Sequence, residues 1–147
     1  LAFAGPAVRP GALLVDLRDN DGGLLSTAVA TARLFVRQGS HILSLQKASA
    51  SRTGELRTVH KYHRRWYHHG IGSEWRQVPI VVLVNGQTAS AAEVFAGAMR
   101  YSGRALLLGE RTFGKGTSQA LVHQPDGHAL IFTVYSLAAG EGRMQQP

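Results

Sequence analysis

The segment IVVLVNGQTASAAEVF, residues 80–95, joins an apolar run to a polar turn and then to the start of an amphipathic pattern. The apolar run at 80–84 predicts a buried strand, and Asn85-Gly86 predicts a tight turn. Apolar residues at helical spacing predict a helix that begins beside Ser90. Ser90 is therefore expected at a helix N-terminus, where unpaired backbone N–H groups and the helix dipole favour negative charge.

Ser90 has two interpretations from this segment alone. As a nucleophile, its hydroxyl oxygen would attack a carbonyl carbon, and nearby amides would stabilise the resulting oxyanion. As a capping residue, Ser90 would exchange hydrogen bonds with Glu93, because Ser90-Ala91-Ala92-Glu93 fits a capping box. Helix caps are far commoner than nucleophiles, so the rest of the chain has to decide between them.

Length and composition predict a single globular domain, because 147 residues with a hydrophobic share of 44% can bury a core. The opening segment at 1–5 is too short for a signal peptide or a membrane span, so we attribute this start to processing or excision. The absence of cysteine excludes disulfides, thiolate metal sites and cysteine nucleophiles. The net charge of +7 is compatible with binding to nucleic acid, anionic lipid or an acidic substrate.

Other segments predict further strands and one more helix around the central strand and helix. The predicted helix covers residues 24–36, and the predicted strands cover residues 12–17, 41–45, 104–108, 120–122 and 129–135.

The polar loop at 16–23 follows the first predicted strand. A calcium loop is a poor fit, because placing Asp19 and Asp21 as its third and fifth ligands puts Leu17 and Ala28 where oxygen ligands are needed. The adjacent Gly22 and Gly23 indicate a backbone with unusual dihedral angles or a backbone that comes close to a ligand. A plain glycine turn stays an open alternative.

Residues 46–77 collect much of the positive charge and lack clean periodicity, so we expect an exposed hairpin or flap there. Aromatic and basic residues alternate here, so a surface that binds single-stranded nucleic acid is an alternative. A strand with one solvent-exposed face and one packed face explains the same pattern more simply. A zinc site is also conceivable, although no helical His-Glu-x-x-His pattern or cysteine accompanies the histidines. The four histidines concerned are His60, His63, His68 and His69.

Residues 109–116 nearly match a phosphate-binding loop. Gly109, Gly114 and Lys115 fit its pattern, but Gly116 stands where the magnesium-binding hydroxyl should be. The following residues predict strands instead of the helix that completes such a phosphate site. A nucleotide-binding protein is therefore an unfavoured alternative.

A serine nucleophile needs a general base. Lys115 is the candidate because, unlike the histidines, it lies in a loop that follows a predicted strand, as Ser90 and the two glycines do. Holding a lysine neutral means lowering its pKa from about 10.4 towards 7 to 8, which burial away from water can impose. The flanking glycines, Gly114 and Gly116, allow the backbone to bring this lysine close to Ser90.

Three segments together resemble the signature motifs of the carboxyl-terminal processing peptidases, also called tail-specific proteases. They are Asp16-Leu17-Arg18 with Gly22-Gly23, then residues 88–93, and then residues 109–119. Their order agrees with that family, as do the 25 positions from Ser90 to Lys115 and the four from Lys115 to Gln119. The matching segments span residues 12–135.

The resemblance implies an α/β fold with a crotonase-like core of repeated strand-strand-helix units. It implies a serine endopeptidase that cleaves near the C-terminus of protein substrates through a Ser-Lys dyad and an acyl-enzyme. The expected partners are proteins or peptides with an unstructured C-terminus, and neither a metal, a cofactor, a nucleotide nor a nucleic acid is expected. A homo-oligomer stays open, and the family favours export to the bacterial periplasm or cell envelope.

The resemblance also implies a role for each matching residue. Ser90 matches the nucleophile, Lys115 the general base and Gln119 the residue that orients the lysine. The amides of Gly23 and Ala91 match the oxyanion hole. Four more residues are expected to support the site, namely Gly22, Glu93, Gly114 and Gly116.

Members of that family usually carry a PDZ domain before this core, and residues 1–11 are too short for one. We therefore expect residues 1–147 to form one catalytic-core domain, a fragment without its PDZ domain. After Tyr135 the sequence departs from the family pattern, and a strand that completes the core is expected to be missing. A piece that binds peptide at an open sheet edge without turnover is the alternative function.

Overall fold

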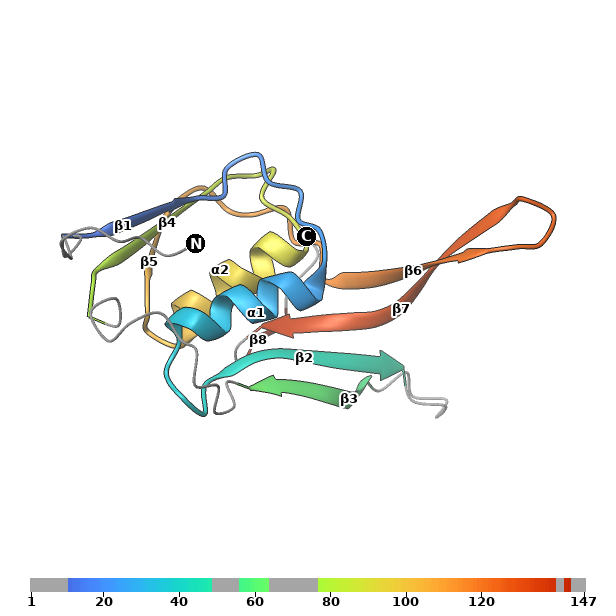
Figure 1. The fold of residues 1–147 in the computed structure, drawn as a ribbon, viewed down its shortest axis with the longest axis horizontal. Coiled ribbons are helices and arrows are strands. Elements are labelled where there is room, and N and C mark those ends of the chain that lie inside the picture. The colour runs from blue at the N-terminus through green and yellow to red at the C-terminus, as the bar shows by residue number, and fades with distance from the viewer. Residues whose placement is uncertain (1–10, 49–55, 64–76, 140–141, 144–147) are drawn as a thin grey trace, which may run out of the picture.

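The computed structural model describes residues 11–48, 56–63, 77–139 and 142–143, and in it two helices lie between two sheets (Figure 1). The elements are β1 (Leu13–Asp16), α1 (Leu25–Phe35), β2 (His41–Ala48), β3 (Leu56–His63), β4 (Ile80–Val84), α2 (Ala91–Tyr101), β5 (Leu106–Gly109), β6 (Thr117–His123), β7 (Ala129–Ala139) and β8 (Gly142–Arg143). One sheet has the order β1-β4-β5, and the other has the order β3-β2-β7-β6 with β8 paired to β7. The fold is thus mixed α/β.

The three-stranded sheet is parallel and sets the position of the site. β4 lies between β1 and β5, and both pairings are parallel. Asp16 is opposite Leu83, and Val84 is opposite Gly109, so the three strands end together. The loops that follow the strands leave this one edge, and they carry six residues of the predicted site: Gly22, Gly23, Ser90, Gly114, Lys115 and Gly116.

The core lies where the two helices meet the larger, antiparallel sheet. Val94 and Met99 of α2 are fully buried, as are Ile42 and Leu43 of β2. The rings of Phe35 in α1 and Phe95 in α2 meet edge to face, with centroids 6.3 Å apart. Such burial is the main stabilisation of a fold of this size, so α2, which carries Ser90 at its start, is held on a packed support.

The larger sheet extends further along the chain than the sequence predicts. We expected the last long strand to end at Tyr135, which is wrong, because β7 continues to Ala139. Leu137 and the two alanines after it are buried, and β7 pairs with β2, with Leu43 opposite Ala139. The sequence signal was weak because Ser136 and small alanines break the apolar run.

Part of the predicted flap at 46–77 is described by the structure. Within it, β3 pairs with β2 in antiparallel orientation, and the ring centroids of His60 and Tyr62 lie 4.4 Å apart. Residues 49–55 and 64–76 lie outside the described residues, and so do His68 and His69 of the zinc hypothesis. Among the described residues, no group of three or more histidines and acids could hold a metal ion. No helix in the described part of the chain is long and apolar enough to span a membrane.

The contact between α2 and β7 gives a prediction about stability. A Cβ atom at Gly97 of α2 would lie 2.9 Å from the Cβ atom of Ala139, so Gly97→Ala should push the helix from the sheet. We expect the free energy of unfolding to fall by about 1–3 kcal/mol in urea denaturation, although alanine is the better helix former.

Gly86→Ala is the matched control, because its Cβ would lie 3.9 Å from the nearest atom, the Arg111 carbonyl oxygen. We expect that variant to stay within about 0.5 kcal/mol of the parent or to gain slightly. Equal losses in the two variants would contradict tight packing at Gly97.

Candidate active site

Ser90 lies at the sharp junction between the β4 turn and α2. Its backbone angles are φ 54° and ψ −119°, a conformation that costs a residue other than glycine about 1–3 kcal/mol. The sequence predicted a helix N-terminus here, and the structure places Ser90 at the N-cap of α2. A sharp strand-to-helix turn of this kind presents a serine hydroxyl away from the backbone.

Glu93 connects the start of α2 to the loop that carries Lys115. Its carboxylate is buried, with 6% of the residue exposed, and each of its oxygens accepts two hydrogen bonds. Oε2 accepts from the backbone N–H groups of Ser90 (2.8 Å) and Lys115 (2.9 Å). Oε1 accepts from the Thr112 hydroxyl (2.7 Å) and the Gly114 N–H (2.7 Å). One side chain therefore fixes the backbone of the predicted nucleophile, Ser90, and of the predicted general base, Lys115.

The capping interpretation and the nucleophile interpretation of Ser90 are compatible in this geometry. Ser90 and Glu93 form a capping box, and in one half of it the Ser90 backbone N–H donates to the Glu93 carboxylate (2.8 Å). In the other half of the box, which is also present, the Ser90 side chain faces the backbone N–H of Glu93. A hydroxyl in that arrangement keeps its proton and a second lone pair, so capping does not exclude attack on a carbonyl.

Gly22 and Gly23 bring the loop after β1 against the Ser90 turn. Gly22 has φ 103°, and a Cβ atom there would lie 2.7 Å from the Ala89 carbonyl oxygen and 2.8 Å from the Ala91 nitrogen. Gly23 has φ 148°, and a Cβ atom there would face open space. The geometry favours close backbone approach over a plain glycine turn.

The loop around Lys115 is fixed through its backbone. Gly114 and Gly116 are buried, and the Gly116 N–H donates to the Gly114 carbonyl (2.8 Å). The Gly116 carbonyl in turn accepts from the Leu137 N–H of β7 (2.8 Å). Lys115 itself is half-buried, and Gln119 is exposed on β6. Among the described residues, no hydrogen bond joins the side chains of Ser90, Lys115 and Gln119.

A cavity of about 230 Å³ adjoins the predicted oxyanion amides. Its lining is mostly apolar and comes from the β1 loop, α1 and the start of α2: Val15, Leu17, Asn20, Gly22, Gly23, Leu24, Thr27, Ala28, Thr31, Ala91, Ala92 and Phe95. Of the α1 residues among them, Ala28 belongs to the apolar spacing that predicted the helix, whereas Thr27 and Thr31 carry no sequence signal that marks them as pocket lining.

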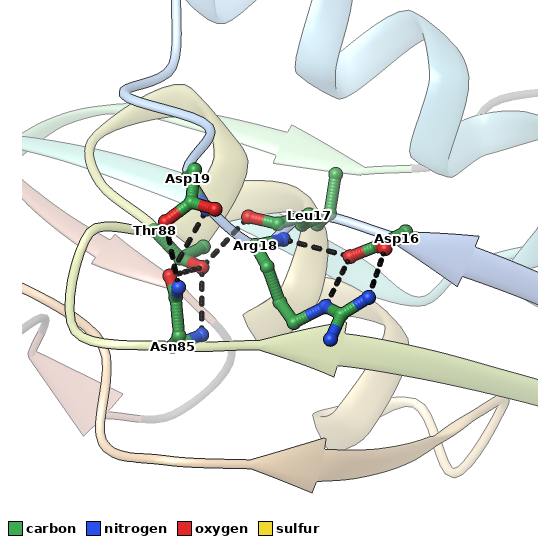
Figure 2. Close-up of polar contacts among 6 residues, drawn as sticks. All are labelled: Asp16, Leu17, Arg18, Asp19, Asn85 and Thr88. Atoms are coloured by element: carbon green, nitrogen blue, oxygen red, sulfur yellow. Dashed lines mark hydrogen bonds and ion pairs between the residues drawn. The ribbon is translucent and has the colours of Figure 1, made fainter.

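Asp16 and Arg18 form an ion pair at the end of β1 (Figure 2). The Asp16 carboxylate accepts from the Arg18 Nη2 (2.7 Å), Nε (3.0 Å) and backbone N–H (3.0 Å). The side-chain hydrogen bonds, followed by the backbone bond, lower the pKa of Asp16 from 3.8 to about 2. Both side chains are about half exposed, so the pair orders the loop start more than it stabilises the fold.

This ion pair predicts a specific titration. Arg18→Gln should raise the pKa of Asp16 from about 2 towards 3.8, measured by NMR of the carboxyl carbon. Because folding lowers this pKa, the pair favours the folded state above the unfolded pKa of about 3.9, and that contribution is lost as the pH falls through about 2. Arg37→Gln, in the loop after α1, is the control and should leave the titration unchanged. An unchanged Asp16 pKa in Arg18→Gln would contradict the assigned cause.

Glu93→Gln tests the buried carboxylate. A glutamine has one side-chain acceptor oxygen, so two of the four donors would face an NH₂ group instead. We expect the free energy of unfolding to fall by about 2–4 kcal/mol, because buried donors lose their acceptor. Glu110→Gln, at an exposed position, is the control and should change stability by less than about 0.5 kcal/mol. A loss in Glu93→Gln no larger than in the control would contradict the role of this carboxylate.

Comparison with known proteins identifies the family. The family model of peptidase family S41 matches residues 9–146 of this chain. The chain is 37% identical over 121 residues to a carboxyl-terminal-processing protease of Picosynechococcus sp., covering 82% of this chain and 26% of that protein. It is 39% identical over 130 residues to a chloroplastic C-terminal processing peptidase of Tetradesmus obliquus, covering 87% and 25%.

A solved structure agrees with these relatives. The photosystem II D1 C-terminal processing protease is similar with a TM-score of 0.70 and 37% identity, over 92% of this chain and 32% of that chain. The chain spans about a quarter of the length of the curated relatives it matches. The family match covers nearly all of this chain, and the chain therefore belongs to peptidase family S41, the family of the carboxyl-terminal processing proteases.

Proposed function

We propose that this chain carries the active site of a serine endopeptidase, with Ser90 as the nucleophile and Lys115 as the general base, on a crotonase-like core. The observation that carries the proposal is the Glu93 carboxylate, which ties the strained Ser90 turn and the Lys115 loop to the same oxygen. Strain of this kind persists where surrounding contacts fix it, and it concentrates at active sites.

The proposed reaction uses these groups in the following order. Neutral Lys115 takes the proton of the Ser90 hydroxyl while the oxygen attacks the carbonyl carbon of a peptide bond. The amides of Gly23 and Ala91 stabilise the oxyanion, and Gln119 orients the lysine. Lys115 then gives the proton to the leaving amine, which leaves an acyl group on Ser90. Water, activated by the same lysine, hydrolyses that ester and restores the enzyme.

The names of the relatives support the choice of substrate. They are carboxyl-terminal processing proteases, so we propose protein substrates with an unstructured C-terminus that are cut near that end. The apolar cavity beside Gly22, Gly23 and Ala91 suits an apolar substrate side chain next to the bond that is cut. An exported location and assembly into a homo-oligomer belong to the same proposal.

The test compares Ser90→Ala and Lys115→Arg with the parent on an unstructured protein, using the protein as its gene encodes it. Ser90→Ala should abolish cleavage. Lys115→Arg keeps the positive charge but cannot be deprotonated in a protein, so the rate should fall by about 10²–10⁴ or more. Product formation is followed by mass spectrometry, which also locates the cut.

Replacement of His123 by Gln is the control for a histidine base, and we expect turnover within a few-fold of the parent. An active Lys115→Arg variant would contradict the choice of base. Equal cleavage by Ser90→Ala and the parent would contradict the nucleophile. Stable peptide binding by the parent with no product would instead favour a protein that only binds peptide at a sheet edge.

A further inference from the structure

A second set of contacts joins the loop after β1 directly to the turn after β4. The Asn85 Oδ1 accepts from the Asp19 backbone N–H (3.0 Å), and the Asn85 Nδ2 donates to the Asp19 Oδ1 (2.8 Å) (Figure 2). The two residues thus form a closed pair of hydrogen bonds across 66 positions of sequence. Asp19 has φ 60°, so the loop is bent at the point where it meets Asn85.

Thr88 joins the same two loops from the buried side. Its side chain is completely buried, and its hydroxyl accepts from the Asn85 N–H (3.0 Å) while donating to the Leu17 carbonyl (2.8 Å). The Thr88 carbonyl also accepts from the Phe113 N–H (3.0 Å), in the loop that carries Lys115. Thr88 therefore contacts all three loops that leave the parallel sheet.

These bonds do more than stabilise a local turn. The turn itself is closed by two local bonds, from the Gln87 N–H to the Asn85 Oδ1 (3.1 Å) and from the Thr88 N–H to the Asn85 carbonyl (3.0 Å). The bonds to Asp19 and Leu17 connect different loops and add nothing to the turn itself. The backbone continues the connection, because the Ala89 N–H donates to the Asn20 carbonyl (2.9 Å).

We propose that Asp19, Asn85 and Thr88 form a loop clamp that positions the Gly23 amide relative to the Ser90 hydroxyl. The inference rests on the proposed function, because the clamp matters for turnover only if Ser90 is the nucleophile. The clamp residues are positioning residues, since they act through the loop backbone and do not touch the substrate.

The consequence is an effect on turnover more than on binding. Oxyanion donors act on charge that develops in the transition state, and an error in their position of about 1 Å can cost about 10²-fold in rate. Substrate binding along the rest of the site does not depend on that charge. A loosened clamp should therefore lower kcat and leave KM nearly unchanged.

The test is a reciprocal exchange within the clamp. Asn85→Asp keeps the acceptor for the Asp19 and Gln87 amides but replaces the donating NH₂ group with an oxygen that faces the Asp19 carboxylate. We expect kcat to fall by about 10–100-fold with KM within about threefold. Adding Asp19→Asn restores the pair with the roles exchanged, because the new amide at position 19 donates to the new carboxylate at position 85. We expect kcat to return to within about threefold of the parent.

Asp21→Asn is the matched control, because it makes the same chemical change in the same loop. The Asp21 side chain makes no hydrogen bond or ion pair within the described part of the chain. Its kcat should stay within about twofold of the parent, as for surface substitutions away from structural contacts.

Amide hydrogen exchange of residues 17–23 gives a second measurement that needs no activity. Exchange there should rise at least about tenfold in Asn85→Asp, return in the double variant and stay at the parent rate in Ser90→Ala. Unchanged exchange in Asn85→Asp would overturn the clamp whether or not the protein cuts.

The kinetic outcomes separate the two proposals. If Ser90→Ala cuts as well as the parent, the proposed function fails. If the parent cuts, Ser90→Ala does not, and Asn85→Asp keeps its kcat, the positioning inference fails alone. A double variant no better than Asn85→Asp would also overturn the inference, because the pair would then not act as a unit.

Discussion

The buried carboxylate of Glu93 is the constraint on which the site depends. Burying a carboxylate is costly unless its oxygens are hydrogen-bonded, and here four donors from two segments supply those bonds. Its place in the first turn of α2 adds the favourable end of the helix dipole. The cost of leaving this group unpaired therefore keeps the start of α2 and the loop at 110–116 together.

The parallel sheet explains why separate parts of the sequence can share that constraint. Because β1, β4 and β5 end at one edge, the loops that follow them lie next to one another although they are far apart in the sequence. The antiparallel sheet supports this edge from the other side of the helices (Figure 1). The bond from the Leu137 N–H to the Gly116 carbonyl makes that support direct, since it joins β7 to the loop that carries Lys115.

Local patterns allowed the strand at 80–84, the turn and the helix after Ser90 to be predicted, because periodicity and the turn residues are properties of neighbouring positions. The extent of β7 was not predictable, because the burial of residues 137–139 depends on β2, far away in the sequence. The same limit applies to Glu93. Its spacing from Ser90 indicated a helix cap, whereas its bonds to Gly114 and Lys115 come from the fold.

Ser90 shows why a cap and a reactive group need not exclude each other. A hydroxyl oxygen has two lone pairs, so a serine oxygen that faces a backbone N–H of its helix still keeps one lone pair and its proton. In this chain the Glu93 carboxylate takes the Ser90 amide, and Gly22 packs against the turn so closely that no side chain fits between them. The strained backbone of Ser90 is thus held by the Glu93 carboxylate and by Gly22, so the Ser90 hydroxyl is not the sole cap of α2, which is compatible with the nucleophile role that we propose for it.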